Sequence, residues 1–167
     1  AGKPAGDVLW YLGDAVDHLP DAYADFPEGY AFDYLNQDAL LTRIEWKNGC
    51  FTTPDGTAWS VLWVPDTYFM RPETKAKLDA LAASGGRIVY GGVAELKAVL
   101  KSAVAPSVIT TPRLGGYPNE DFMWLRREDG DTERYFICAG TNGWRGFVEF
   151  RSEKPATVFD PVTKRRG

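Results

Sequence analysis

Residues 7–14 read DVLWYLGD, and this run carries the strongest structural signal in the chain. Residues 8–12 are apolar without interruption, which is typical of a short strand buried on both faces of a sheet. The strand ends at Gly13-Asp14, where a long segment rich in aromatic and acidic residues begins. Open α/β sheets hold their ligands at the carboxyl ends of strands, so this pattern predicts a central strand that leads into a functional loop.

That loop, residues 14–36, combines aromatic rings with carboxylates. Rings can cover the C–H faces of a sugar while carboxylates accept hydrogen bonds from its hydroxyl groups, so one interpretation is a carbohydrate site. The other interpretation is that the rings pack the loop onto the core and the acidic groups are solvated. Tyr34 would then be a core residue and Asn36 a helix cap. The candidate substrate-binding residues are Asp14, His18, Asp33, Tyr34 and Asn36.

Strand-like and helix-like runs alternate from this loop to residue 112. The clearest helix follows Pro72, which suits a first helical turn, and Gly85-Gly86 ends it. Alternation of this kind predicts an α/β fold with a doubly wound, mostly parallel sheet. The expected elements are helices over residues 38–46, 72–83 and 94–104, strands over 58–64, 87–90 and 108–110, and a hairpin turn at 54–56.

The pattern changes after residue 112. Residues 113–120 are rich in glycine and proline and are predicted to be a linker. Strand-like runs separated by Asp-Gly and Asn-Gly turns follow, and they predict a short antiparallel β-meander. We therefore expect an α/β domain over residues 1–112 and an antiparallel segment over 121–167. So short a meander leaves much unpaired edge, so the segment should belong to a larger β-domain or pack on the first domain.

Composition excludes several functions. The formal net charge of the 167 residues is −4, which argues against a nucleic-acid partner. No apolar run reaches the roughly 20 residues of a membrane-spanning helix, and no amino-terminal signal pattern is present. Cys50 and Cys138 stand far apart, no CxxC pair occurs, and His18 is the single histidine, so we expect neither a metal site nor a disulfide framework. The chain also lacks the glycine motifs that hold cofactor phosphates.

Few catalytic arrangements fit the sequence. There is no GxSxG motif, and no cysteine stands at a sharp strand-to-helix turn with a histidine partner. Carboxylates remain, since Asp14, Asp17, Asp33 and Asp66 are all expected near the carboxyl edge of the sheet. A glycosidase uses two carboxyl groups at a defined separation, which a sequence does not reveal. An independent enzyme with a carboxylate pair thus stays an alternative.

Several long segments resemble a known family. They are DVLWYLGD, PEGYAFDYLNQDALL at residues 27–41, and DGTAWSVLWVPDTYFMRPETKAKLDALAASGGRIVYG at 55–91. Together they resemble the region that follows the catalytic barrel in the α-L-rhamnosidase-like enzymes of glycoside hydrolase family 106. RYFICAGTN at 134–142 and ATVFDPVTKRRG at 156–167 resemble a later strand and the ending of that region. Lys164-Arg165 replaces the glycine usual after DPVT, and residues 113–119 match no family pattern.

The resemblance implies an accessory, non-catalytic region of a glycoside hydrolase. It implies a flavodoxin-like domain, related to class I amidotransferases but without their catalytic residues, that supports the barrel and contributes a loop to the substrate site. The remainder of the hydrolase would be the partner, carbohydrate a possible ligand, and the location secreted or periplasmic. No catalytic residue or metal ligand of the family carries over to this chain. A stand-alone carbohydrate-binding module and a structural or oligomerisation domain remain the alternatives.

Overall fold

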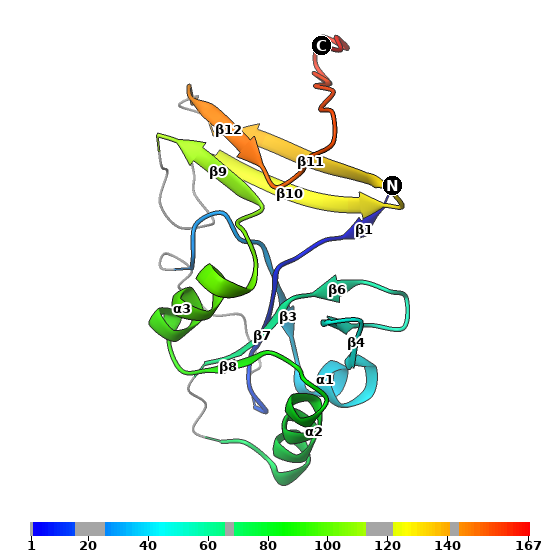
Figure 1. Cartoon of the computed structure of the whole chain (residues 1–167), viewed down its shortest axis with the longest axis vertical. Helices are drawn as coiled ribbons and strands as arrows, with labels where there is room; N and C mark the ends of the chain where they lie inside the picture. Colours follow the sequence, from blue (N-terminus) through cyan, green and yellow to red (C-terminus); the bar gives the residue numbers. More distant parts are fainter. Residues whose placement is uncertain (1, 16–25, 66–68, 113–121, 141–143) are drawn as a thin grey trace.

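The computed structural model describes residues 2–15, 26–65, 69–112, 122–140 and 144–167. Figure 1 shows two parts, a parallel sheet flanked by helices at one end and antiparallel strands at the other, where both chain termini also lie. The elements are β1 (Lys3–Pro4), β2 (Val8–Tyr11), β3 (Phe32–Leu35), α1 (Gln37–Arg43), β4 (Glu45–Lys47), β5 (Cys50–Thr52), β6 (Ala58–Trp59), β7 (Val61–Val64), α2 (Pro72–Ala83), β8 (Ile88–Tyr90), α3 (Val93–Ala103), β9 (Val108–Thr111), β10 (Phe122–Asp129), β11 (Thr132–Ala139) and β12 (Phe147–Phe150).

The parallel sheet has the strand order β3-β2-β7-β8. β2 is one of the two central strands and pairs in parallel with β3 on one side and β7 on the other. Every residue of β2 and of β7 is buried, as the apolar runs in the sequence predict for strands covered on both faces. The predicted strand at the start of the chain is thus confirmed.

Each face of this sheet has its own apolar core. On one face, Leu9 and Leu62 of the central strands pack with Leu40 of α1 and Leu78 of α2. The small antiparallel sheet β4-β5-β6 adds Phe51 to the same core. On the other face, a second core lies beneath α3. Its members are Val8, Trp10, Phe26, Tyr30, Val61, Trp63, Val89, Leu96 and Leu100.

The antiparallel end contains two sheets, with orders β1-β10-β11 and β9-β12. Val108 of β9 forms a core with Phe122 and Trp124 of β10. Rings from both sheets also meet, since the centroids of Tyr135 on β11 and Phe150 on β12 are 4.5 Å apart. The two sheets therefore pack face to face around a small core. We call β1 and β9 to β12 the antiparallel layer, and β2, β3, β7 and β8 with the three helices the parallel layer.

The prediction of a flavodoxin-like, doubly wound fold is wrong. Strands make up 36% of the described residues and helices 21%, and three of the four sheets in this part of the chain are antiparallel. β9 follows α3 along the chain, as a further strand of a doubly wound parallel sheet would, but it pairs with β12 in a separate antiparallel sheet. β9 alternates buried and exposed residues, which suits a strand covered on one face and not the middle of a parallel sheet.

The predicted meander is also wrong in its pairing. The hairpin of β10 and β11 is present, with eight residue pairs from Phe122↔Ala139 to Asp129↔Thr132. β12, however, pairs with β9 rather than returning to β11. β1 pairs with β10, so both new pairings join strands from either side of residue 112. The division into domains at residues 1–112 and 121–167 remains a prediction.

None of the helices in the described ranges combines the length and the apolar composition that crossing a bilayer requires.

Candidate functional site

The carboxyl end of β2 holds a polar network centred on Asp14. The Asp14 carboxylate accepts hydrogen bonds from the Tyr11 hydroxyl, the Arg71 backbone N–H and the Thr74 hydroxyl, the last at 2.9 Å. Gln37 extends the network, because its amide donates to the Thr74 Oγ1 at 2.9 Å and accepts from Arg71 Nη1 at 3.5 Å. We call these five residues the carboxyl-edge network. It joins the ends of β2 and β3 to the start of α2.

Asp14 caps the N-terminus of helix α2, although it lies 57 residues before Arg71 in the sequence. Arg71 is the N-cap residue of α2, and its own side chain makes no capping hydrogen bond. Asp14 instead accepts from the Arg71 N–H and from Thr74 in the first turn. A carboxylate at this position also interacts favourably with the positive end of the helix dipole. The network therefore fixes α2 against the sheet edge.

The hydrogen bonds set the protonation of Asp14. Desolvation raises the pKa of its carboxyl, but the hydrogen bonds from Tyr11, the Arg71 backbone and Thr74 favour the charged form more strongly. The pKa of Asp14 consequently lies below its ordinary value. Burial, and then the hydrogen bond to Asp14, raise the pKa of Tyr11. Near neutral pH the pair is a carboxylate and a neutral phenol, so Asp14 is an acceptor and not a proton donor.

The other predicted residues lie apart from Asp14. Asp33 accepts a 2.8 Å hydrogen bond from Trp59 Nε1, whereas Tyr34 packs its ring against Trp10 on the opposite face of the sheet. Asn36 caps helix α1, accepting from the Ala39 N–H at 2.9 Å. Asp14 thus lies near the start of α1, because Asp14 and Gln37 both hydrogen-bond to Thr74. Asp33 is not part of this network. Three other candidates lie outside the described residues: Asp17, His18 and Asp66.

A second polar cluster was not predicted. Asp7, only 1% exposed, accepts from the Ala31 N–H at 2.9 Å and from Ser107 Oγ at 2.9 Å. Arg151 completes the cluster, with Nη2 2.7 Å from Asp7 Oδ1. These contacts tie the start of β2 to the chain before β9 and after β12, so they join the two layers. An acidic residue directly before an apolar run was the available signal, but its partners are up to 144 residues away.

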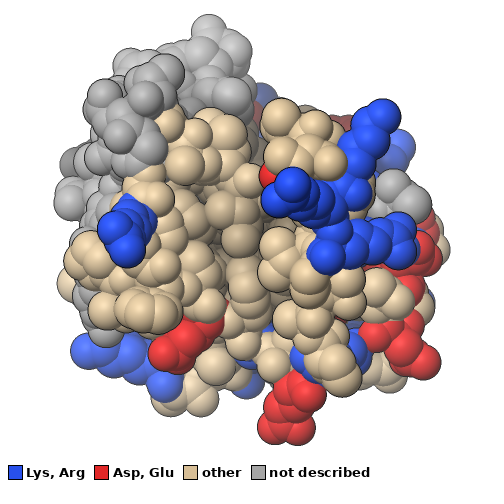
Figure 2. Space-filling view, turned by 90° about the horizontal axis from the view of Figure 1, so that it is seen from above, with Lys and Arg blue, Asp and Glu red and all other residues tan. Residues whose placement is uncertain are grey.

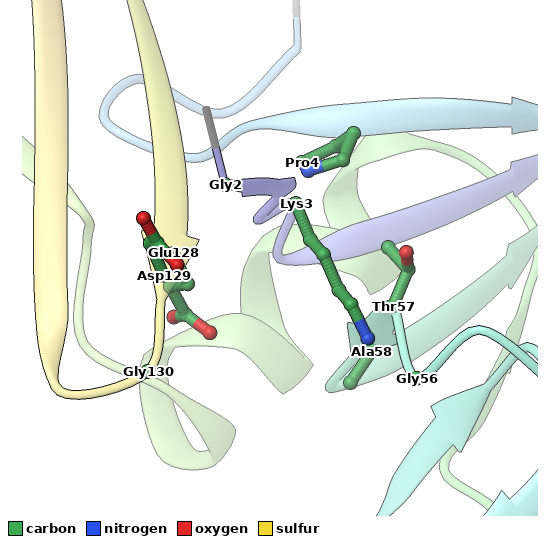
Figure 3. Close-up of a pocket in the computed structure, with 9 residues that line it drawn as sticks. All are labelled: Gly2, Lys3, Pro4, Gly56, Thr57, Ala58, Glu128, Asp129 and Gly130. Atoms are coloured by element: carbon green, nitrogen blue, oxygen red, sulfur yellow. The ribbon is translucent and has the colours of Figure 1, made fainter.

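A cavity of about 230 Å³ lies elsewhere, between β1, the turn before β6 and the end of β10. In Figure 3 the Lys3 side chain extends toward residues 56–58, while Glu128 and Asp129 enter from β10. Lys3 Nζ donates to the Asp55 carbonyl oxygen. The described lining residues are Gly2, Lys3, Pro4, Gly56, Thr57, Ala58, Glu128, Asp129 and Gly130, and none of these has an aromatic ring on which a sugar could stack.

Both acidic groups of this cavity already have cationic partners. Glu128 pairs with Arg126, and Asp129 lies 2.8 Å from Arg134 Nη1. The hydrogen bond and charge of Arg134 lower the pKa of Asp129. Asp129 is therefore not set up to donate a proton. Across the described ranges, no three His, Cys, Asp or Glu residues are grouped so that they could hold a metal ion.

The comparisons with known proteins agree with the resemblance in the sequence. Residues 1–101 match the profile of glycoside hydrolase family 106, described as alpha-L-rhamnosidase. The chain belongs to glycoside hydrolase family 106. The match includes the whole carboxyl-edge network and Asp7, whereas the partners Ser107 and Arg151 of Asp7 lie beyond residue 101.

Two relatives are much longer than this family 106 chain. A protein of Formosa agariphila named "Putative beta-glucuronidase" is 28% identical over 89 residues, which are 53% of this chain and 8% of that protein. The structure of a rhamnosidase from Novosphingobium sp. PP1Y matches with a TM-score of 0.63 and 20% identity, over 81% of this chain and 17% of that one. That likeness shows a shared fold. The chain thus spans less than a fifth of either relative.

Proposed function

We propose that this chain is an accessory, non-catalytic region of a rhamnosidase-like glycoside hydrolase. In this proposal it supports the catalytic barrel of a longer enzyme, and the segment after β2 contributes to one edge of the substrate site. Family membership supports the hydrolase context. The chain's small share of the two relatives supports a role as one region among several.

The protonation of the carboxyl groups carries the non-catalytic part of the proposal. Glycosidases need a carboxylic acid with a raised pKa that protonates the leaving group. Among the described residues, every carboxyl group with a clear shift has its pKa lowered. Asp14, the best placed of the predicted site residues, uses its carboxylate to hold α2. This arrangement favours a structural role for the acidic groups.

An activity assay tests the proposal. The 167-residue chain is incubated with 4-nitrophenyl α-L-rhamnopyranoside, beside the full-length hydrolase that carries it, and release of nitrophenol is followed. We expect turnover with the full-length enzyme and none with the chain alone. Turnover by the chain alone that is lost in the variant Asp33→Asn or Asp14→Asn would identify an independent enzyme.

Calorimetry separates the accessory role from a binding module. Rhamnose and rhamnosyl oligosaccharides are titrated into the 167-residue chain. We expect no measurable heat, because Asp33, Tyr34 and Asn36 are engaged with Trp59, Trp10 and the Ala39 N–H. Saturable binding would instead favour a stand-alone carbohydrate-binding module.

A further inference from the structure

We infer that the outer face of the β10–β11 hairpin is an interface covered by another domain of the same hydrolase polypeptide. The inference rests on the proposed function, because it requires this chain to be one region of a longer enzyme. It goes beyond that function by naming the surface of contact. We call the side chains of Met123, Leu125, Phe136 and Cys138 the hairpin patch.

The strand register places these four side chains on one face. Met123 stands opposite Cys138 and Leu125 opposite Phe136, and residues directly opposite in an antiparallel pair share a face. Phe122 and Trp124, which alternate with them along β10, point to the core of the antiparallel layer and are buried. Met123, Leu125 and Phe136 are 46%, 48% and 53% exposed, and Cys138 is also exposed. A contiguous apolar patch of this kind marks an interaction site.

The two arginines next to the patch make hydrogen bonds within the chain. Arg127 and Arg134, the next pair along the same face, donate to the Gly2 carbonyl oxygen and to Asp129. Figure 2 looks down on the antiparallel end and shows a broad surface without charged side chains beside a group of Lys and Arg residues. The patch therefore calls for an apolar partner surface rather than an oppositely charged one.

Among the described residues, no strand pairs with the outer edge of the hairpin. β11 is the last strand of its sheet, and its eight pairs with β10 run without a bulge. Its sequence, TERYFICA, has charged residues at Glu133 and Arg134, near the turn, and residues 135–139 contain neither a charged residue nor the proline that can protect an edge strand. Ile137, on the inner face opposite Trp124, is 46% exposed. A partner that covers the patch can thus also pair with the edge, as in strand addition.

The flanking polypeptide is the occupant that the structure favours. The matching region is 17% of the Novosphingobium rhamnosidase chain, so most of such an enzyme lies outside it. Both ends of this chain lie at the antiparallel end, and a domain joined there is tethered close to the patch. Tethering by a short linker gives effective concentrations on the order of millimolar, so a patch of modest size is enough.

Cys138 reports directly on this interface. The rate of alkylation of Cys138 by iodoacetamide is measured, with mass spectrometry for site assignment, in the 167-residue chain and in the full-length hydrolase. We expect Cys138 to be labelled at least about tenfold more slowly in the full-length enzyme than in the 167-residue chain, because a covered thiol reacts only in locally opened molecules. Cys50, partly exposed on β5 of the small antiparallel sheet β4-β5-β6, is the internal control and should react at the same rate in both proteins.

Matched variants locate the contact. In the full-length hydrolase, Phe136→Glu places a charge in the patch and should restore labelling of Cys138 to the rate of the 167-residue chain. Tyr90→Glu on β8 is the control, since Tyr90 is 52% exposed and lies at the other end of the molecule. Leu125→Glu, a second patch variant, should act like Phe136→Glu.

Two results would overturn the inference. Equal labelling of Cys138 in both proteins would show that no domain covers the patch. A concentration-dependent loss of labelling in the 167-residue chain, with a dimer mass in light scattering, would show that a second copy is the occupant. Neither result bears on the proposed lack of catalysis, which the rhamnoside assay decides separately.

Discussion

The parallel and antiparallel layers differ in how completely they bury their apolar side chains. β2 and β7 are buried at every residue, with helices on both faces of their sheet. In the described part of the antiparallel layer, the inner faces form a core, whereas Ile109, Phe136 and Phe147 are exposed. A sheet covered on both faces buries its apolar side chains within the chain, whereas a sheet with an exposed apolar face is suited to contact with a partner.

The ion pair of Asp7 and Arg151, which joins the two layers, should give one of the two largest effects on stability. In Arg151→Met the buried carboxylate of Asp7 loses its cation, and an unpaired buried charge is strongly unfavourable. We expect a loss of about 3 kcal/mol in the free energy of unfolding, at the low end for a buried pair because Arg151 is partly exposed. Urea denaturation measures this loss. Hydrogen exchange should show β9 and β12 opening before β2, and uniform opening would contradict a separate antiparallel layer.

A matched pair of leucines compares the layers directly. Leu62 is fully buried in β7, and Leu125 lies in the exposed hairpin patch. Leu62→Ala should lower the free energy of unfolding by about 2–5 kcal/mol, because it removes buried apolar contacts and leaves a cavity. Leu125→Ala should change it by less than about 0.5 kcal/mol in the 167-residue chain. Similar losses in thermal or urea unfolding would show that the hairpin patch is already covered.

Asp14 tests how the parallel layer holds α2. Asp14→Asn keeps the shape but presents an amide donor to three hydrogen-bond donors, so we expect a loss of roughly 1–3 kcal/mol at pH 7. Because folding lowers the pKa of Asp14, its contribution is fully present above the unfolded pKa of about 3.9 and declines as pH falls through the lower folded pKa. The difference between the two proteins should therefore be constant above about pH 5 and shrink below about pH 4. A difference that does not vary with pH would show that Asp14 acts by packing alone.

The smallest effect is expected at the local cap of α1. Asn36→Ala removes the acceptor of the Ala39 N–H and should cost about 1 kcal/mol. Asn36→Asp is the control, because it keeps a capping oxygen and should retain most of the stability. A loss of glycan affinity in the full-length enzyme without any change in stability would instead favour the substrate-binding interpretation of Asn36.

Local sequence patterns predict an element correctly where one segment is sufficient to define it. Helix α2 has the bounds that Pro72 and Gly85-Gly86 indicate. The second predicted strand, residues 58–64, divides at Ser60 into β6 and β7, which pair with different sheets. The helix predicted to run to Trp46 ends at Arg43, since Trp46 pairs with Phe51 instead. In each case pairing with another segment, invisible in a local pattern, decided the outcome.

By itself the sequence indicated the buried strand that begins at Val8, the approximate positions of the three helices, the hairpin turn within residues 128–131 and the resemblance to the hydrolase family, because each depends on residues close together or on ordered motifs. Only the tertiary structure decided that β9 joins β12, that Asp7 pairs with Arg151 and that Asp14 caps α2. In sequence, the closest β9–β12 pair is 36 residues apart, Asp14 and Arg71 are 57 apart, and Asp7 and Arg151 are 144 apart. The formation of these contacts depends on how whole layers pack, which no short pattern encodes.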